Sequence, residues 1–215
     1  MSSIFLIFND PLVAARMRTT LDATPGLLVA GWATTLAQAH EAIQSAKPDL
    51  VLSALELIDG PFDEFVGELK SKRRYGNPLA MVVAMSLDDG RVMEVMRQGA
   101  DGYFLLNRST KTLAVTIQQV LAGGSPMAPE IARQINAHFD ALAWDHTDFI
   151  GESQNPLRLT DAERRLLNLI ADGREVEELA RSMQTTEQNL GTRLRGLYRK
   201  LRFDTSAATL SLDLV

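Results

Sequence analysis

Short apolar runs alternate with amphipathic stretches over residues 1–122. Five of the runs have the length of strands, and between them apolar residues recur at the spacing of a helix. The strand-like runs are residues 4–8, 27–32, 49–53, 79–85 and 102–106. The helical stretches are residues 11–21, 36–46, 62–73, 89–97 and 109–122. Unbroken apolar runs suit strands that are buried on both faces, so the alternation predicts an α/β domain with a doubly wound parallel sheet.

Residues 159–202 have a purely helical pattern. Three helical stretches follow one another there, with short breaks between them. In the third stretch leucines recur every three or four residues and form one stripe, which predicts a buried face. These leucines are Leu190, Leu194, Leu197 and Leu201. The last quarter of the chain is therefore predicted to be an all-α domain.

The segment between these regions has the composition of a linker. Gly123, Gly124, Ser125 and Pro126 interrupt the first pattern, and residues 129–140 form an amphipathic helical stretch that begins with a proline. We therefore expect two domains joined by a linker that contains a helix. The predicted divisions are residues 1–122, 123–158 and 159–215.

The composition of the whole chain is that of an ordinary globular protein. Its 215 residues carry a net charge of -5 and are 46% hydrophobic, which suits two compact domains. The chain has no cysteine, which excludes disulfides and thiolate metal sites and fits a reducing cytoplasm. The N-terminal apolar run ends at Asn9 and has no basic region before it, so it is too short for a signal peptide or a membrane span. We expect a cytoplasmic protein with no membrane attachment.

Positive charge is concentrated on the third helical stretch. Residues 189–202 contain five basic residues and no acid, whereas residues 159–188 contain seven acids and four arginines. A helix with leucine on one face and arginine on the other suits the major groove of DNA, because arginine contacts phosphates and guanine edges. A helix with an ordinary solvated charged face has the same pattern, so charge alone leaves both interpretations open.

Four short motifs in this region resemble the LuxR-type helix-turn-helix. They are LT and E at 159, 160 and 163, A and G at 171 and 173, ELA at 178–180, and KL at 200–201. Thr160 and Glu163 are also spaced as a capping box, which predicts that a helix begins there. The resemblance implies a four-helix DNA-binding domain that works as a homodimer, with residues 205–215 as its fourth helix.

The resemblance assigns DNA contacts to one face of the third helix. It implies that Thr192 and Arg195 reach bases, with Gln188 on the same face. The neighbouring cations are expected to contact phosphate, and they are Arg193, Arg199 and Lys200.

The same helix departs from the family's pattern at several positions. Asn189 stands where the family usually has threonine, and Gly191 stands where it usually places a lysine or arginine. Gly191 and Gly196 each cost the helix about 1 kcal/mol relative to alanine. These departures motivate an alternative function, namely a non-DNA-binding interaction protein that dimerises with another regulator and inhibits it.

Two motifs in the first region resemble the receiver domain of two-component response regulators of the NarL/FixJ subfamily. They are PDLVL at 48–52 and GADGY at 99–103. The resemblance implies a flavodoxin-like (βα)5 fold with its site at the carboxyl ends of the strands. A receiver followed by a LuxR-type domain is the order found in that subfamily, so the two resemblances support each other.

The residues that carry phosphorylation chemistry in a receiver are mostly replaced. By the resemblance, Asn9 and Asp10 stand for the acidic pair that binds a divalent cation, and Ala54 stands for the aspartate that accepts phosphate. Ala84 stands for the threonine or serine that ends the fourth strand, and Leu106 stands for the lysine. An alanine methyl cannot attack a phosphoryl group, and without the lysine no cation balances the phosphate charge. We predict a pseudo-receiver that needs no metal or cofactor and is not switched by phosphate.

One alternative assignment at this site remains open. A shift of two residues would place Ser86 at the end of the fourth strand in place of Ala84.

The chain has no nucleophile–base pair and no Gly-rich phosphate loop, so we do not expect an enzyme. The sequence predicts an atypical response regulator that binds DNA and is controlled by its expression level, by a protein partner or by a small-molecule effector at the receiver.

Overall fold

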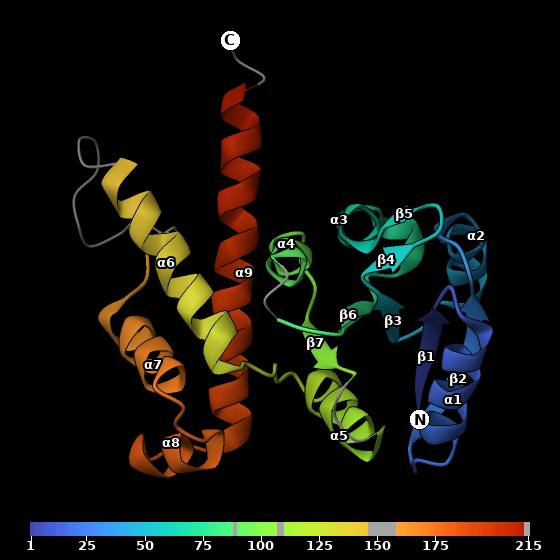
Figure 1. Cartoon of the computed structure of the whole chain (residues 1–215), viewed down its shortest axis with the longest axis horizontal. Helices are drawn as coiled ribbons and strands as arrows, with labels where there is room; N and C mark the ends of the chain where they lie inside the picture. The colour runs from blue at the N-terminus through green and yellow to red at the C-terminus, as the bar shows by residue number, and fades with distance from the viewer. Residues whose placement is uncertain (88–89, 107–109, 146–157, 213–215) are drawn as a thin grey trace.

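A computed structural model describes residues 1–87, 90–106, 110–145 and 158–212 of the chain (Figure 1). Its α/β part contains one five-stranded parallel sheet in the order β2-β1-β3-β6-β7. The strands are β1 Ser2–Ile7, β2 Leu27–Ala33, β3 Leu50–Ala54, β6 Leu79–Ala84 and β7 Gly102–Leu105. All five predicted strands are therefore present, and the predicted fold class of this part is confirmed.

Helices cover both faces of the sheet (Figure 1). The helices of this part are α1 Pro11–Asp22, α2 Leu36–Ala46, α3 Phe62–Ser71, α4 Arg91–Arg97 and α5 Thr110–Leu121. Leu50 and Leu52 of β3 pack toward α1 and α5, whereas Val51 packs toward α2, α3 and α4. This alternation is the period-two geometry of a strand, and the unbroken apolar run at positions 50–52 explains why the strand is buried on both faces.

Three short elements of the described α/β part were not predicted. Strands β4 Glu56–Leu57 and β5 Gly60–Pro61 form an antiparallel hairpin just after β3. A 3₁₀ turn, Arg73–Tyr75, follows α3 where the sequence predicts a longer helix. Elements of two or three residues are too short to produce a periodic pattern, so sequence periodicity could not reveal them.

The helical part consists of α6 Pro129–Asp145, α7 Asp161–Ala171, α8 Val176–Ser182 and α9 Glu187–Leu212. The predicted capping box at the start of α7 is confirmed, because Glu163 N donates to Thr160 Oγ1 and Thr160 N donates to Glu163 Oε2. Helix α6 lies in the predicted linker and packs against α7. Asn136 donates to Asn168 across that contact at 2.8 Å.

The third and fourth predicted helices form one continuous helix. We expected the third helix to end near Arg202 and a separate helix to begin near Thr205, but α9 runs from Glu187 to Leu212. Residues 203–206 contain neither glycine nor proline, so nothing in the backbone forces a break there. Leu210 and Leu214 recur at helical spacing in the predicted fourth helix, but they lie outside the side chains that the structure describes.

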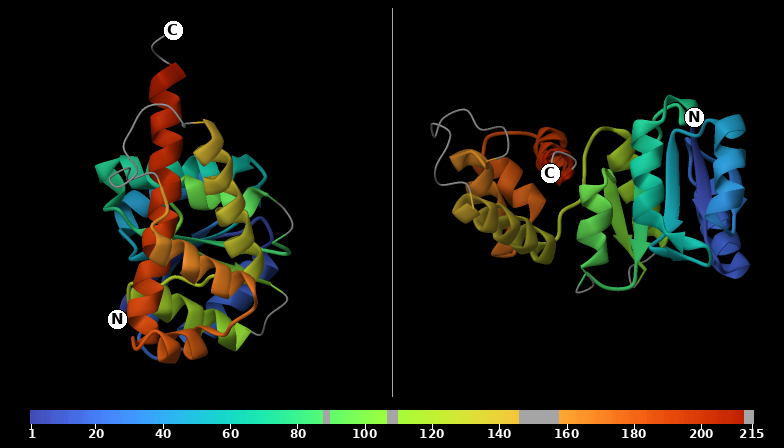
Figure 2. Two further views of the ribbon diagram at one scale, coloured as in Figure 1. Left: turned by 90° about the vertical axis from the view of Figure 1, so that its left-hand side faces the viewer. Right: turned by 90° about the horizontal axis from the view of Figure 1, so that it is seen from above.

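Helix α9 lies between the other helices of its own part and the α/β part, as Figures 1 and 2 both show. On the α/β side it contacts α4. Val92 and Met96 of α4 belong to the same buried apolar cluster as Leu190 and Leu194 of α9. The two parts therefore share a continuous core in this structure. No helix within the described residues is long and apolar enough to cross a membrane.

Candidate nucleic-acid interface and strand-edge cavity

The exposed side of α9 carries four of the residues predicted to contact DNA. Gln188, Thr192, Arg193 and Arg199 are all exposed. Thr192 donates its hydroxyl to the carbonyl of Gln188 at 3.0 Å, as helical threonines commonly do. Neither Arg193 nor Arg199 forms an ion pair with a described residue, so both guanidinium groups remain available to an anionic partner.

Lys200, also predicted to contact phosphate, holds two helices together in this structure. Its Nζ donates to Glu163 Oε2 at 2.6 Å and to the carbonyl of Arg158 at 3.0 Å. Burial raises the pKa of the Glu163 carboxyl, but the hydrogen bonds from Lys200 and Thr160 outweigh this effect and lower the pKa overall. Lys200 thus ties α9 to the capping box of α7, and a contact with phosphate stays a prediction.

Arg195 is placed differently from the other predicted DNA contacts. Its side chain is only 8% exposed, and its Nη2 donates to the carbonyl of Val120, at the end of α5, at 2.6 Å. Its Nε is buried with no acceptor among the described residues. Burial lowers the pKa of this guanidinium, the charge of Asp101 raises it, and Arg199 lowers it further. In this arrangement Arg195 contacts the α/β part and cannot reach a duplex.

Two further residues of α9, Gly191 and Tyr198, pack against the linker near Arg195. Gly191 packs so closely that a Cβ added to it would lie 3.0 Å from the Cα of Gly124. Tyr198 donates its hydroxyl to the carbonyl of Pro126 at 2.8 Å. Burial raises the pKa of that hydroxyl well above its usual value, and the charge of Tyr103 and its hydrogen bond raise it further. We call Gly191, Arg195 and Tyr198 the docked face of α9.

The docked face was not foreseen from the sequence. We expected Arg195 on the solvated side of the helix and interpreted Gly191 as a lost DNA contact and a residue that weakens the helix. Two features of the sequence could have indicated it: Gly191 lies one turn before Arg195, and the linker contains the adjacent glycines Gly123 and Gly124. Because glycine has no side chain, two backbones can approach closely where glycines meet. A methyl group added at Gly196, by contrast, would meet nothing within 4 Å, and no contact in the structure explains that glycine.

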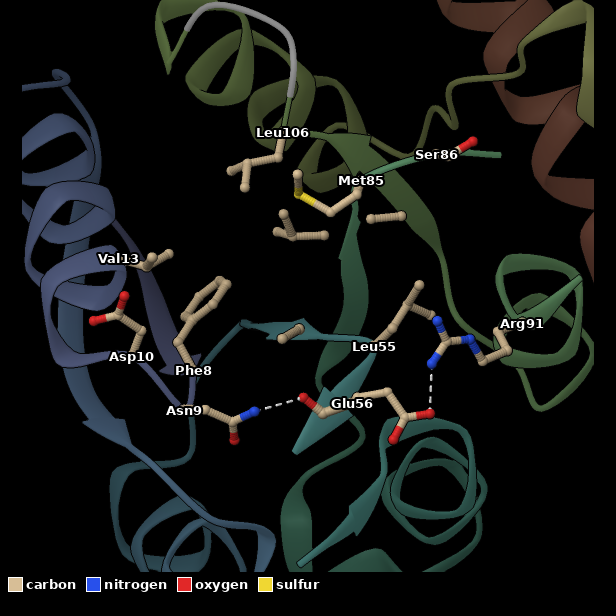
Figure 3. Close-up of a pocket in the computed structure, with 13 residues that line it drawn as sticks. Phe8, Asn9, Asp10, Val13, Leu55, Glu56, Met85, Ser86, Arg91 and Leu106 are labelled. Atoms are coloured by element: carbon tan, nitrogen blue, oxygen red, sulfur yellow. Dashed lines mark hydrogen bonds and ion pairs between the residues drawn. The ribbon is translucent and has the colours of Figure 1, made fainter. Parts of the chain in front are cut away.

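The five residues at the predicted receiver site surround one cavity. Asn9, Asp10, Ala54, Ala84 and Leu106 all line a space of about 370 Å³ at the carboxyl edge of the sheet (Figure 3). Each follows or ends a strand, which is why a parallel topology brings them together. Ala84 is the last residue of β6, and Ser86 follows in the loop.

Three polar side chains at this cavity form hydrogen bonds with other parts of the protein. Asn9 donates to the carbonyl of Glu56 at 2.9 Å and accepts from the amide of Ile58 at 2.9 Å, so its side chain fixes the hairpin loop. Asp10 is the N-cap of α1 and accepts from the amide of Leu12 at 2.8 Å. Arg91 donates to Glu56 at 2.6 Å across the rim (Figure 3). Within the described residues no group of three histidines or acids is placed to hold a metal ion.

The rest of the cavity lining is apolar. Phe8, Val83 and Ala84 are buried and form its floor, while Met85 is 74% exposed. Figure 3 shows the Phe8 ring, the Met85 side chain and the Leu106 side chain directed toward a common space. An alanine stands at the end of β3 and a leucine follows β7, so the cavity offers hydrocarbon where a phosphoryl group would need a nucleophile and a cation.

Curated proteins similar to this chain match it along most of its length. The DNA-binding transcriptional activator DevR/DosR of Mycobacterium tuberculosis is 28% identical over 217 residues, covering 100% of this chain and 95% of that protein. The transcriptional regulatory protein MctR of Rhizobium johnstonii is 29% identical, covering 95% of this chain and 89% of MctR. The nitrate/nitrite response regulator NarL of Escherichia coli is 25% identical, covering 94% and 89%. No protein-family model matches the chain.

Solved structures show the same fold. A LuxR-family two-component response regulator from Aurantimonas sp. superposes with a TM-score of 0.57 at 23% identity, covering 64% of this chain and 97% of that one. The response regulator RcsB of Salmonella typhimurium superposes with a TM-score of 0.54 at 16% identity, covering 93% and 91%. The homologues of this chain are therefore transcription regulators rather than enzymes, and they belong to the NarL/LuxR family of response regulators, whose fold the chain shares.

Proposed function

We propose that the chain is a cytoplasmic, dimeric, DNA-binding transcription regulator whose receiver-like domain is not switched by an aspartyl phosphate. The observation that carries DNA binding is the exposed pair Arg193 and Arg199 on α9, neither of them neutralised by a described acid. Similarity to DevR/DosR, a DNA-binding transcriptional activator, and to NarL, a response regulator, supports it. Phosphate contacts from such arginines supply much of the affinity for a duplex.

Independence from phosphate is supported by the cavity at the sheet edge. Ala54 ends β3 where the resemblance places the phosphate acceptor, and the described lining residues include no lysine. The arginine at the rim, Arg91, is bound to Glu56. A bound phosphoryl group would therefore meet no acceptor aspartate at the end of β3 and no lysine among the described lining residues, and Asp10 would repel it.

DNA binding requires the docked face to separate from the α/β part. Arg195 is buried against Val120, and Gly191 packs directly against the backbone of Gly124. A DNA backbone therefore has no room on this side of α9. The buried guanidinium makes this docked arrangement costly, because its Nε lacks an acceptor among the described residues. We propose an equilibrium between the docked arrangement and an open one, in which only the open one binds DNA.

The first test measures DNA binding directly. Fluorescence anisotropy of the full chain with duplexes from the region upstream of its own gene should give an affinity that falls steeply with salt. Arg193→Ala and Arg199→Ala should each weaken binding and each reduce the slope of log affinity against log salt by about 0.9. Arg18→Ala is the matched control, because it removes the same charge from α1, where Arg18 pairs with Asp22.

The competing proposal is an interaction protein that pairs with another regulator and inhibits it. It is favoured by the burial of Arg195. A folded dimer that binds no duplex at low salt would support this alternative and contradict DNA binding. Equal effects of the three arginine variants would mean that α9 is not the contact surface.

A second test concerns the phosphate switch. Beryllofluoride with Mg²⁺ mimics the phosphoryl group on an aspartate, so it should produce no saturable change in the ¹H–¹⁵N spectrum or the DNA affinity of the chain. Ala54→Asp alone should not restore switching, since Leu106 supplies no cation beside the new carboxylate. Saturable binding of beryllofluoride to the unaltered chain would contradict a phosphate-independent receiver.

A further inference from the structure

We propose that the cavity at the carboxyl edge of the sheet is a binding site for a small apolar molecule that carries a cationic amine. Its volume of about 370 Å³ falls within the range of pockets that hold small molecules, roughly 300–1,000 Å³. A buried cavity of about 150 Å³ already holds benzene, so this one has room for a fused bicyclic ring with a short side chain.

The lining matches an apolar ring system. Phe8 and Val83 provide a buried aromatic and aliphatic floor, and the small side chains of Ala54 and Ala84 leave the space unfilled. Met85 is 74% exposed at the mouth. A flexible, exposed methionine beside an apolar cavity gains burial when a ligand covers it.

The charges at the rim favour a cation over an anion. The described residues that line the cavity carry two acids, Asp10 and Glu56, and one base, Arg91. Glu56 and Arg91 neutralise each other at 2.6 Å, which leaves the carboxylate of Asp10. Asp10 lines the cavity beside Phe8. One of its oxygens caps α1, and the second has no hydrogen-bond partner among the described residues. An amine placed there gains a charge-assisted hydrogen bond, whereas a carboxylate or phosphate would be repelled.

The cavity is also connected to the docked face. Arg91 is the first residue of α4, and α4 packs against α9. A ligand that contacts the Glu56–Arg91 pair therefore contacts the start of α4, the helix that packs against α9. Occupancy of the cavity would then shift the equilibrium between the docked and open arrangements. This consequence rests on the proposed function, whereas binding of the ligand does not.

Binding is tested by ¹H–¹⁵N NMR titration of the full chain, without DNA, using three probes that share one bicyclic ring. Tryptamine carries an ammonium, 3-(indol-3-yl)propionate carries a carboxylate on a similar chain, and indole carries neither. Tryptamine and indole should cause saturable shifts at the cavity residues, with tryptamine binding about tenfold more tightly and the propionate more weakly than indole.

Three variants locate the site. Asp10→Asn keeps an oxygen to cap α1 and should reduce the affinity for tryptamine to that for indole. Ala54→Leu fills the cavity and should weaken both probes at least about tenfold, by loss of the space that one ring needs. Leu106→Lys places a cation at the partly buried edge of the cavity and should reverse the preference toward the propionate.

Each outcome bears on the proposal. Absence of saturable shifts with all three probes would overturn it, and so would shifts that persist unchanged in both Ala54→Leu and Leu106→Lys. Tighter binding of the propionate than of tryptamine by the unaltered chain would overturn the choice of a cation. A chain that binds tryptamine at the cavity and binds no duplex would retain this inference and contradict the proposed function.

Discussion

Replacing Gly191 by alanine is expected to raise the affinity of the chain for DNA about tenfold. The added methyl would lie 3.0 Å from Gly124 Cα and 3.5 Å from Ser125 N. Both are backbone atoms, which cannot rotate away as a side chain can, so α9 and the linker must shift apart by a few tenths of an ångström. The change therefore destabilises the docked arrangement and raises the population of the open one, which alone exposes Arg195.

Gly196→Ala is the matched control for this experiment. Both glycines lie within α9, so both substitutions should stabilise the helix by about 1 kcal/mol. A methyl at position 196 meets nothing within 4 Å, so this variant should raise thermal stability without changing DNA affinity. Anisotropy with one duplex compares the two variants, and small-angle scattering should show a larger radius of gyration for Gly191→Ala alone. Equal affinities and equal radii would contradict the docking equilibrium.

The fold of the α/β part could be predicted from the sequence because its signals are local. Each strand is an apolar run, and each helix repeats apolar residues at its own period. The meeting of Asn9, Ala54 and Leu106 at one edge could also be predicted, since parallel strands bring their carboxyl ends together. The structure confirms that these residues share a cavity. Their loss of phosphate chemistry stays a prediction.

The contact between the two parts could not be predicted, because it depends on residues far apart in the chain. The hydrogen bond of Arg195 joins it to Val120, 75 residues earlier. A helical wheel shows which side of α9 is apolar, but it does not show that a charged residue beside that stripe is buried by another part of the chain. The continuity of α9 past Arg202 was missed for a different reason, since the family resemblance suggested a break that the residues themselves do not require.

The cavity and the docked face are linked by one short helix. Arg91 at the start of α4 bonds to Glu56 at the cavity rim, and Val92 and Met96 of α4 share the apolar cluster that includes α9. A change at the rim can therefore reach α9 through a single rigid element, without any covalent modification. Under the proposed function, this arrangement would connect the sheet edge of a receiver without a phosphate acceptor to the helix that binds DNA.

Replacing Arg195 by methionine is expected to weaken DNA binding about a hundredfold or more, because two effects add. In the docked arrangement methionine fills a similar volume without a buried charge, and such exchanges are neutral or stabilising by about 1–4 kcal/mol. In the open arrangement the variant lacks a guanidinium that would contact a base, a loss of about 1–3 kcal/mol.

Anisotropy measures the combined effect on DNA affinity, and the double variant with Gly191→Ala separates the two contributions. If stabilised docking dominates, the double variant should recover most of the affinity. If the lost base contact dominates, it should recover little. A rise in DNA affinity for Arg195→Met alone would show instead that the bond from Arg195 to Val120 holds the docked arrangement together, and that the unpaired Nε does not make docking costly.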